Sequence, residues 1–288
     1  MSKERVVLCT TVGQPQLTQS LKLCLLGCED QPPYGPAKHT GTMFLDLLKQ
    51  AAERDHLHIC IEITIYQVQQ LDYPKSYGDF DGVLLPGSFS AAYQDDAWVL
   101  KLKEVIRESL WAQRIPTLGV CFGHQILAHA MEGGVATKCP SGPQVGCRFF
   151  QTRKESREFA YSDDDNEASQ ELSLLYTHGD MVETLPEMAT ALGGTAEVPI
   201  QGAIYHFEED PIFVTFQAHP EYASQGPKQA TMRTIMRKME ERGAISNHES
   251  ALEQVEVHWE TIYRDSMQVM VTTCRLLNWF PDTSNDQD

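Results

Sequence analysis

The sequence predicts an α/β fold, an open and mostly parallel sheet with helices on both faces. Two observations carry this expectation. In the first half of the 288 residues, apolar runs of strand length alternate with stretches of helical periodicity, which is the order expected of a parallel sheet. Apolar residues make up 42% of the chain, which is enough for a sizeable core, and no internal repeat divides it.

The first half of the chain provides most of the parallel sheet. The strand pattern is clearest at Ile59, Ile61, Ile63 and Ile65, which alternate at period two. Helical stretches carry their apolar residues on one face. The expected strands cover residues 6–12, 21–27, 58–68, 81–85 and 115–120, and the expected helices cover 42–54, 95–113 and 122–131.

The second half is richer in strands, which are expected over residues 145–151, 172–176, 200–207 and 212–217. An acidic stretch at 162–167 is typical of an exposed insertion. We expect one domain over 1–228, with 1–20 as an N-terminal extension. Residues 229–280 are helical again, in two pieces broken near 243–247, and predict a C-terminal helical extension packed on the same domain. The polar tail 281–288 is expected to be disordered.

Composition argues against several classes of protein. Lys and Arg number 23 against 40 Asp and Glu, and the net charge of −17 disfavours nucleic acid and anionic membranes as partners. The sequence contains no run of about 18 apolar residues, so no membrane span is expected. The apolar run 6–12 is short and lacks the small-residue cleavage site of a signal peptide. The eight cysteines are scattered, without Cys/His pairs at zinc-site spacing. We therefore expect a cytoplasmic protein with free thiols, no metal site and no cofactor.

The strongest chemical signal is a sharp turn at Cys121. A buried strand runs directly into Gly119-Val120-Cys121-Phe122-Gly123 and then into a helix, as in a nucleophile elbow with Cys in place of Ser. Such a turn strains the central residue and projects its side chain from the sheet. It also places the sulfur at a helix N-terminus, where the helix dipole favours the thiolate. The alternative is a buried cysteine in an ordinary strand-to-helix turn.

A cysteine nucleophile needs a base, and His219 is the best placed of the ten histidines. It ends a β-rich run, and Glu221 follows it across Pro220, so a carboxylate can fix the imidazole tautomer. The alternative for a single histidine is a structural role. Cys121, His219 and Glu221 together predict a catalytic Cys–His–Glu triad in which the acid follows the base.

These two motifs together resemble the class I, or triad, glutamine amidotransferase family. Residues 119–125 are similar to the family's nucleophile motif and 219–221 to its base and acid, within a resemblance that spans residues 20–225. The resemblance implies a flavodoxin-like sheet. It also implies a catalytic cysteine that attacks a γ-glutamyl amide.

Further substrate contacts are expected on the strength of the same resemblance. His178 and Asp180 belong to a segment similar to the family's His-Gly-Asp segment and either position the substrate or cap a turn. Gln125 and its neighbour His124 either line the glutamine pocket or simply begin a helix.

The family also implies an oxyanion hole after the third strand of the sheet, where a Gly-Gly-Pro turn is common. Gly87 matches this turn, but Ser88 stands in place of the second glycine; a serine N–H can still donate. Backbone N–H groups near Cys121, Phe122 and Ser88 are the expected donors. This Gly-Ser variant resembles a stand-alone subgroup, similar to the γ-glutamyl peptidases and to the amidotransferase portion of GMP synthetase.

Three functions remain open on the sequence alone. The first is a hydrolase that cleaves the γ-glutamyl amide bond of glutamine or a γ-glutamyl peptide through a covalent γ-glutamyl thioester. The second is a glutaminase subunit that delivers ammonia to a separate synthetase or acceptor chain, because this chain has no phosphate-binding P-loop and no room for an ATP-dependent domain. The third is a non-catalytic regulatory module, against which the complete Cys–His–Glu set argues.

Overall fold

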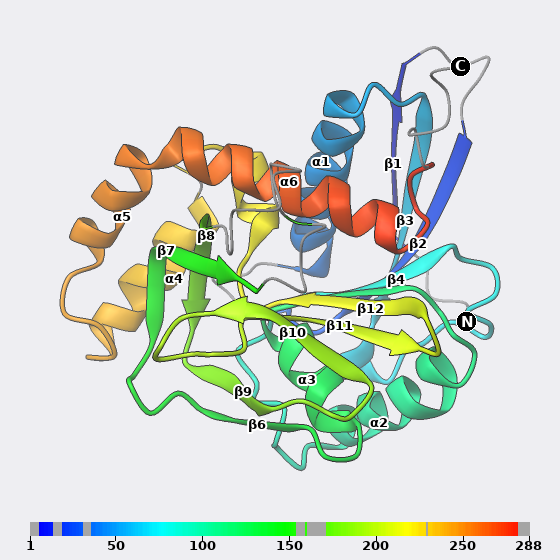
Figure 1. Cartoon of the computed structure of the whole chain (residues 1–288), viewed down its shortest axis with the longest axis horizontal. Helices are drawn as coiled ribbons and strands as arrows, with labels where there is room; N and C mark the ends of the chain where they lie inside the picture. Colours follow the sequence, from blue (N-terminus) through cyan, green and yellow to red (C-terminus); the bar gives the residue numbers. More distant parts are fainter. Residues whose placement is uncertain are drawn as a thin grey trace.

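A ten-stranded sheet with helices on both faces forms the body of the molecule (Figure 1). The computed structural model describes residues 6–13, 19–30, 36–153, 159, 171–228 and 230–281, and the statements below concern these residues. The strands are β1 (Val7–Val12), β2 (Gln19–Gly27), β3 (Ile59–Gln67), β4 (Gly82–Leu85), β5 (Thr117–Val120), β6 (Val135–Lys138), β7 (Gln144–Thr152), β8 (Glu171–His178), β9 (Asp180–Thr184), β10 (Ala189–Gly194), β11 (Gly202–Phe207) and β12 (Asp210–Phe216). Their order in the sheet is β1-β3-β2-β4-β5-β12-β11-β10-β7-β8, and β6 pairs with β9 separately.

The helices form a layer on each face of the sheet. Figure 1 shows α1 (Ala37–Arg54) and α6 (Trp259–Leu276) on one face, with α2 (Ala97–Val105) and α3 (Phe122–Ala130) on the other. Two more helices, α4 (Ala230–Glu241) and α5 (His248–Val257), lie beside β7 and β8. Short helical turns complete the described chain: the 3₁₀ turns η2 (Val68–Gln70) and η5 (Pro220–Gln225), and the π-helical turn η3 (Ile106–Trp111).

The central strand β2 shows why the layers form. Its side chains alternate between the two faces, and both faces are apolar. Leu23 and Leu25 lie in the core beneath α1, whereas Cys24 and Leu26 lie in the core beneath α2 and α3. A strand that buries both faces needs a helical layer on each side, so the sequence of β2 itself requires the sandwich.

The predicted fold class is confirmed, with one refinement: the sheet is mixed. Parallel pairing holds for the five strands β3-β2-β4-β5-β12, as expected from the first half of the chain. The edge strand β1 pairs antiparallel with β3, and β12-β11-β10-β7-β8 are all antiparallel. Between β10 and β12 the connections are short, and short connections join antiparallel neighbours. The expectation of a mostly parallel sheet therefore holds for β3, β2, β4, β5 and β12 alone.

Several expected elements differ in extent. The first helix begins at Ala37, earlier than predicted, and the helix expected over 95–113 ends as the π-helical turn η3. The C-terminal region contains three helices where two pieces were expected, because the chain breaks again at His258 between α5 and α6. Strands β6, β9 and β10 were not predicted. The acidic stretch 162–167 and residues 282–288 of the tail lie outside the described residues.

The C-terminal helix α6 packs against α1 and β8. The division into a domain of residues 1–228 and an extension of 229–280 stays a prediction. Among the described helices, none combines the length and the apolar character needed to cross a bilayer.

Candidate active site

The two sequence motifs meet because their strands are neighbours. β5 and β12 run parallel and pair Val120 with Phe216. Cys121 follows the last residue of β5, and His219 lies shortly after the end of β12. Since the carboxyl ends of parallel strands meet at one edge of a sheet, both residues lie at that edge. The backbone N–H of Cys121 donates to the carbonyl oxygen of Phe216 at 2.8 Å, which ties the two strand ends together.

Cys121 occupies a strained turn. Its φ of 53° and ψ of −104° are unusual for a residue with a side chain, and α3 begins at the next position. Gly123 makes the turn possible, because a Cβ there would lie 2.0 Å from the carbonyl oxygen of Leu85 in β4. A Cβ on Gly119 would lie 2.6 Å from Cδ1 of Leu127. The turn thus has the strand-to-helix geometry of a nucleophile elbow.

A histidine–carboxylate pair lies beside the cysteine. Nδ1 of His219 lies 2.7 Å from Oε1 of Glu221, and both side chains are almost completely buried. The ring of His219 stacks on Tyr222, with 4.3 Å between the ring centroids and 3° between the planes. The backbone N–H of His219 donates to the carbonyl oxygen of Leu175 at 2.7 Å. The imidazole is therefore held by stacking on Tyr222, by the contact of Nδ1 with Glu221 and by the hydrogen bond of its backbone N–H.

The surroundings of His219 favour a charged imidazole. Burial by itself would lower its pKa, but the carboxylate of Glu221 and then the sulfur of Cys121 outweigh burial and raise the pKa of His219 to about 10. Nε2 makes no well-aligned hydrogen bond to any described residue, yet Cys121 is close enough to contribute to this shift. An imidazolium between a carboxylate and a sulfur is the arrangement in which histidine has taken the proton of a thiol.

The segment expected to form the oxyanion hole is organised by Glu29, which sequence reasoning missed. Oε2 of Glu29 accepts hydrogen bonds from the backbone N–H of Phe89 at 2.9 Å and from the hydroxyl of Ser88 at 3.3 Å. Oε1 accepts from the N–H of Asp30 at 2.9 Å. Because the N–H of Phe89 is engaged by Glu29, the loop is fixed in one conformation near Gly87 and Ser88. A signal existed: Glu29 follows the buried strand β2 at the edge where parallel strands place functional groups.

Gln125 connects the elbow to the neighbouring strands, whereas His124 is structural. The amide nitrogen of Gln125 donates to the carbonyl oxygen of Asp180 at 2.8 Å and to Oε1 of Gln217 at 3.0 Å. His124 is fully buried, with Nδ1 at 2.8 Å from Oγ1 of Thr215, and burial lowers its pKa to about 3. A neutral, enclosed His124 has no access to a substrate. Gln125, in contrast, both begins the helix and lines the cavity described below.

His178 and Asp180 line the cavity described below, next to Gln125 of the elbow segment. Nδ1 of His178 donates to the backbone carbonyl oxygen of Asp180 at 2.8 Å, which leaves the lone pair on Nε2. Nε2 is buried and has no partner among the described residues, and burial lowers the pKa of His178 to about 4. The carboxylate of Asp180 accepts from the hydroxyl of Tyr93 at 3.1 Å, and burial raises its pKa. His178 therefore both bonds within its own turn and keeps a ring nitrogen with which a ligand can pair.

A cavity of about 240 Å³ opens above Cys121. It brings together the predicted Ser88, Gln125, His178 and Asp180. Gly87, Phe122, His219 and Glu221 do not line it: all four are buried, and Phe122 packs against Trp98 with 5.6 Å between ring centroids. The cavity is also lined by Ile235, Met239, Arg242 and Ala244, which sequence reasoning missed.

Two other features of the described residues bear on the site. No three His, Cys, Asp or Glu side chains gather as metal ligands would, within the ranges that the structure covers. A larger cavity of about 910 Å³ does not contain Cys121 but lies next to the cysteine cavity and shares Ala244 with it.

Comparison with known proteins places this geometry in a family. The model of class-I glutamine amidotransferases matches residues 44–239, more than half of the chain. Gamma-glutamyl peptidase 3 of Arabidopsis thaliana is 27% identical over 192 residues, which cover 66% of this chain and 75% of that protein. The glutamine-hydrolysing GMP synthase of Streptococcus agalactiae serotype Ia is 30% identical over 141 residues, 49% of this chain and 24% of the synthase.

Solved structures agree on the fold. A glutamine amidotransferase from Thermotoga maritima superposes with a TM-score of 0.64 at 17% identity, covering 89% of this chain and 98% of that one. The resemblance inferred from the motifs at Cys121 and His219 is thus confirmed at the level of family and fold. The chain belongs to the class-I glutamine amidotransferase family and is a hydrolase of the glutamine amidotransferase type.

Proposed function

We propose that this protein cleaves the γ-glutamyl amide bond of a γ-glutamyl compound through a covalent thioester on Cys121. One observation carries the proposal: the strained Cys121 lies beside a buried His219 whose Nδ1 is 2.7 Å from the carboxylate of Glu221. A strained residue that the surrounding structure holds in place is typical of a functional site. The relatedness to Gamma-glutamyl peptidase 3 supports the same bond as the target.

The chemistry follows from the protonation states at the site. The thiolate of Cys121 attacks the γ-carbonyl carbon, and backbone N–H groups near Cys121, Phe122 and Ser88 stabilise the oxyanion. As the C–N bond breaks, the imidazolium of His219 gives its proton to the leaving amine. His219, now neutral, then takes a proton from water, whose oxygen attacks the thioester; the C–S bond breaks, Cys121 leaves as the thiolate, and the γ-carboxyl product loses its proton to solvent. Glu221 keeps Nδ1 protonated and stabilises the imidazolium.

The glutamyl part of the substrate binds on the wall that holds the predicted residues. Nε2 of the neutral His178 is an acceptor, and the carboxylate of Asp180 is an anion, so this wall suits an α-ammonium group. The side-chain amide of Gln125 donates hydrogen bonds to the carbonyl oxygen of Asp180 and to Oε1 of Gln217, and these bonds position the wall. We assign Gly87 and Ser88 to the oxyanion loop, which Glu29 fixes.

Two other functions compete with a stand-alone hydrolase. A glutaminase subunit that passes ammonia to a separate synthetase or acceptor chain is favoured by the match to GMP synthase, which covers only 24% of that protein. A non-catalytic regulatory module is disfavoured, because such a module does not need a buried, charged histidine beside a strained cysteine.

A cytoplasmic location fits the free thiols, since the sulfurs of Cys9 and Cys60 lie 3.7 Å apart without a bond between them.

The deciding experiment is turnover by the purified chain alone. γ-Glutamyl-p-nitroanilide, glutamine and glutathione are compared under the same conditions, with Cys121→Ala as the matched inactive control. We expect the chain to hydrolyse a γ-glutamyl substrate other than free glutamine without a second protein. Negligible turnover of each peptide, with glutamine cleaved only when a synthetase chain is added, supports the glutaminase subunit instead. Equal turnover by Cys121→Ala rejects the thioester mechanism.

A further inference from the structure

One wall of the cysteine cavity comes from α4 and the residues just after it. Arg242 is its only lysine or arginine among the described lining residues, beside the apolar Ile235 and Met239. Its side chain is exposed and makes no ion pair or hydrogen bond with any residue that the structure describes. In a chain with a net charge of −17, an unpaired arginine at the mouth of a nucleophile's cavity is a place where an anion can bind.

Arg242 is held in place by the end of α4. The backbone N–H of Ala244 donates to the carbonyl of Met239, and that of Gly243 donates to the carbonyl of Glu240, each at 2.8 Å. Gly243 has a φ of 70°, so these two bonds form a Schellman motif with Gly243 at its left-handed position. Arg242 is the last residue before that glycine. The motif therefore fixes where its side chain begins, and it places Met239 and Ala244 on the same wall.

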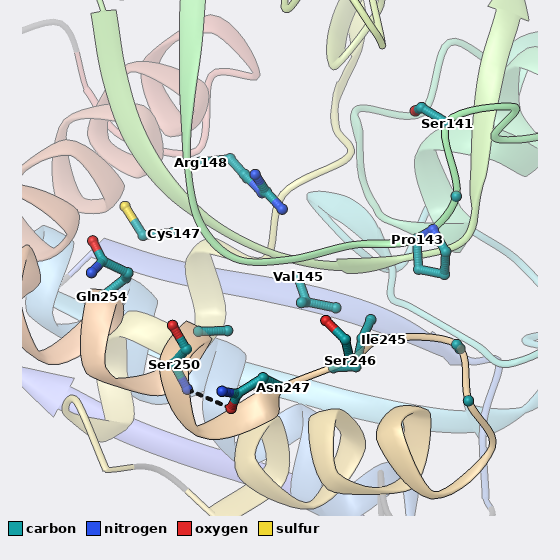
Figure 2. A pocket seen from close by; sticks show the side chains of 14 residues that line it. Ser141, Pro143, Val145, Cys147, Arg148, Ile245, Ser246, Asn247, Ser250 and Gln254 are labelled. Carbon is teal, nitrogen blue, oxygen red and sulfur yellow. Dashed lines mark hydrogen bonds between the residues drawn. The ribbon is translucent and has the colours of Figure 1, made fainter.

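The loop after Arg242 is also fixed. Nδ1 of His248 lies 2.5 Å from Oε2 of Glu240, and the Asn247 side chain accepts from the N–H of Ser250 at 3.0 Å, which caps α5. This loop and β7 enclose the larger cavity of about 910 Å³. Figure 2 shows Ile245, Ser246 and Asn247 of the loop near Val145, with Arg148 further along β7.

The two cavities adjoin at three places. Ala244 lines both of them, and Arg242 of the first precedes Gly243 of the second. Val145 in the second cavity pairs across the β7–β8 ladder with Thr177 in the first. A ligand that fills the small cavity above Cys121 can therefore extend into the larger one past Arg242. Arg148 adds a second positive charge there, near enough to be among the causes that lower the pKa of His178.

We propose that the larger cavity with Arg242 binds the leaving part of the substrate, and that Arg242 selects γ-glutamyl peptides whose leaving group ends in a carboxylate. This inference rests on the proposed function and names its substrate class. The glutamyl group occupies the wall of His178 and Asp180. The scissile nitrogen then faces the wall from α4, where the guanidinium of Arg242 receives the carboxylate of the departing amino acid or peptide. Glutamine, whose leaving group is ammonia, gains nothing from Arg242.

The test compares three substrates that differ only on the leaving side: γ-glutamylglycine, γ-glutamylglycinamide and glutamine. Each is assayed with the wild-type chain and with Arg242→Met, Arg242→Lys and Arg237→Met. Arg237 is the matched control, because it lies on α4 just before Arg242, is exposed, pairs with Glu241 at 3.8 Å and does not line the cysteine cavity. Methionine preserves the length of the side chain and removes its charge.

We expect the wild-type kcat/KM for γ-glutamylglycine to exceed that for the amide by about fivefold, the upper end for one charge pair at an exposed site. Arg242→Met loses that advantage while its loss on the amide and on glutamine stays below about threefold, and Arg242→Lys keeps part of the advantage. Arg237→Met behaves as wild type.

Three results overturn the inference. Equal kcat/KM for the acid and the amide in the wild type shows that no carboxylate is read. A uniform loss in Arg242→Met over all three substrates assigns Arg242 to the glutamyl group itself. If the wild-type chain turns over none of the three substrates, the proposed function itself fails, and the inference fails with it. Failure of the inference alone leaves turnover intact, so the two failures are distinguishable.

Discussion

Replacing Glu221 by glutamine tests how much the negative charge of the Glu221 carboxylate contributes to the action of His219. Oε1 of Glu221 lies 2.7 Å from Nδ1 of His219, and both side chains are buried. Glutamine has the same shape, and its amide oxygen can accept the same hydrogen bond from Nδ1–H. The substitution therefore removes a negative charge and keeps the contact. We expect Glu221→Gln to be folded and slow.

The size of the effect follows from the hydrogen bond. A hydrogen bond to a charged group contributes roughly 1.5–3 kcal/mol and a neutral one roughly 0.5–1.5 kcal/mol, so removing only the charge costs about 1–1.5 kcal/mol. Because about 1.4 kcal/mol corresponds to a factor of ten, Glu221→Gln should lower kcat/KM by about 5- to 13-fold. The same energy corresponds to a fall of about one unit in the pKa of His219 from its value of about 10.

The sign of the pH dependence is fixed by the proton that His219 must donate. The imidazolium is present below the pKa of His219 and lost above it, so activity falls on the alkaline side, and in Glu221→Gln that fall moves to lower pH. Because this folded-state pKa lies above the value of about 6.5 for an unfolded histidine, the charged pair stabilises the fold fully below about pH 6.5. That contribution is lost as the pH rises through about 10.

The assay is kcat/KM on γ-glutamyl-p-nitroanilide between about pH 6 and pH 10.5, for wild type, Glu221→Gln and His219→Asn. His219→Asn serves as the reference for loss of the base and should cost several orders of magnitude. An unshifted alkaline limb in Glu221→Gln would refute the electrostatic role of Glu221. A greater loss in Glu221→Gln than in His219→Asn would refute the assignment of base and orienter.

The remaining predictions concern the nucleophile, its turn and the oxyanion loop. Cys121→Ala should abolish γ-glutamyl cleavage with an unchanged melting temperature. Iodoacetamide near neutral pH should label Cys121 ahead of the exposed Cys9, because partial burial and Cys60 raise the pKa of Cys9. Preferential labelling of Cys9 in a peptide map would contradict this. Gly123→Ala should destabilise the fold by roughly 3 kcal/mol in urea unfolding, because its Cβ would lie 2.0 Å from a carbonyl oxygen of β4; wild-type stability would show that the turn relaxes freely. Glu29→Gln should lower kcat by about tenfold with little change in KM, because it weakens the acceptor that fixes the N–H of Phe89; an effect on KM alone would place Glu29 in substrate binding instead.

The sequence was sufficient for the parts of the site that lie at strand ends. Cys121 and His219 each follow an apolar run, and the parallel order of the first half predicts that such ends meet at one edge. Their neighbourhood still depended on β12 returning beside β5, which the pairing of Phe216 with Val120 provides. The motif resemblance supplied that topology, and local patterns alone did not.

The parts that were missed depend on contacts between distant segments. Glu29 accepts a hydrogen bond from Ser88 in the oxyanion loop, and the two residues meet because β2 pairs with β4. β10 has the sequence Ala-Thr-Ala-Leu-Gly-Gly, which lacks the β-branched alternation that marks a strand. It is a strand because β11 and β7 flank it on both sides, and Gly193 there has a φ of 152° that permits the close approach to Gln151. Such pairing is a property of the assembled sheet.

The family match contains the proposed catalytic residues and ends just before Arg242. The match covers residues 44–239 and so contains Cys121, His219 and Glu221. Arg242 lies just beyond it, as does the loop that borders the larger cavity. In the proposed mechanism, bond cleavage involves Cys121, His219 and Glu221, which all lie within the matched residues. Recognition of the leaving group needs a wall that the sheet does not provide, and here the C-terminal helices build it. A change at Arg242 should therefore alter which peptide is cleaved while the reaction itself remains, and that separation is what the comparison of acid and amide substrates measures.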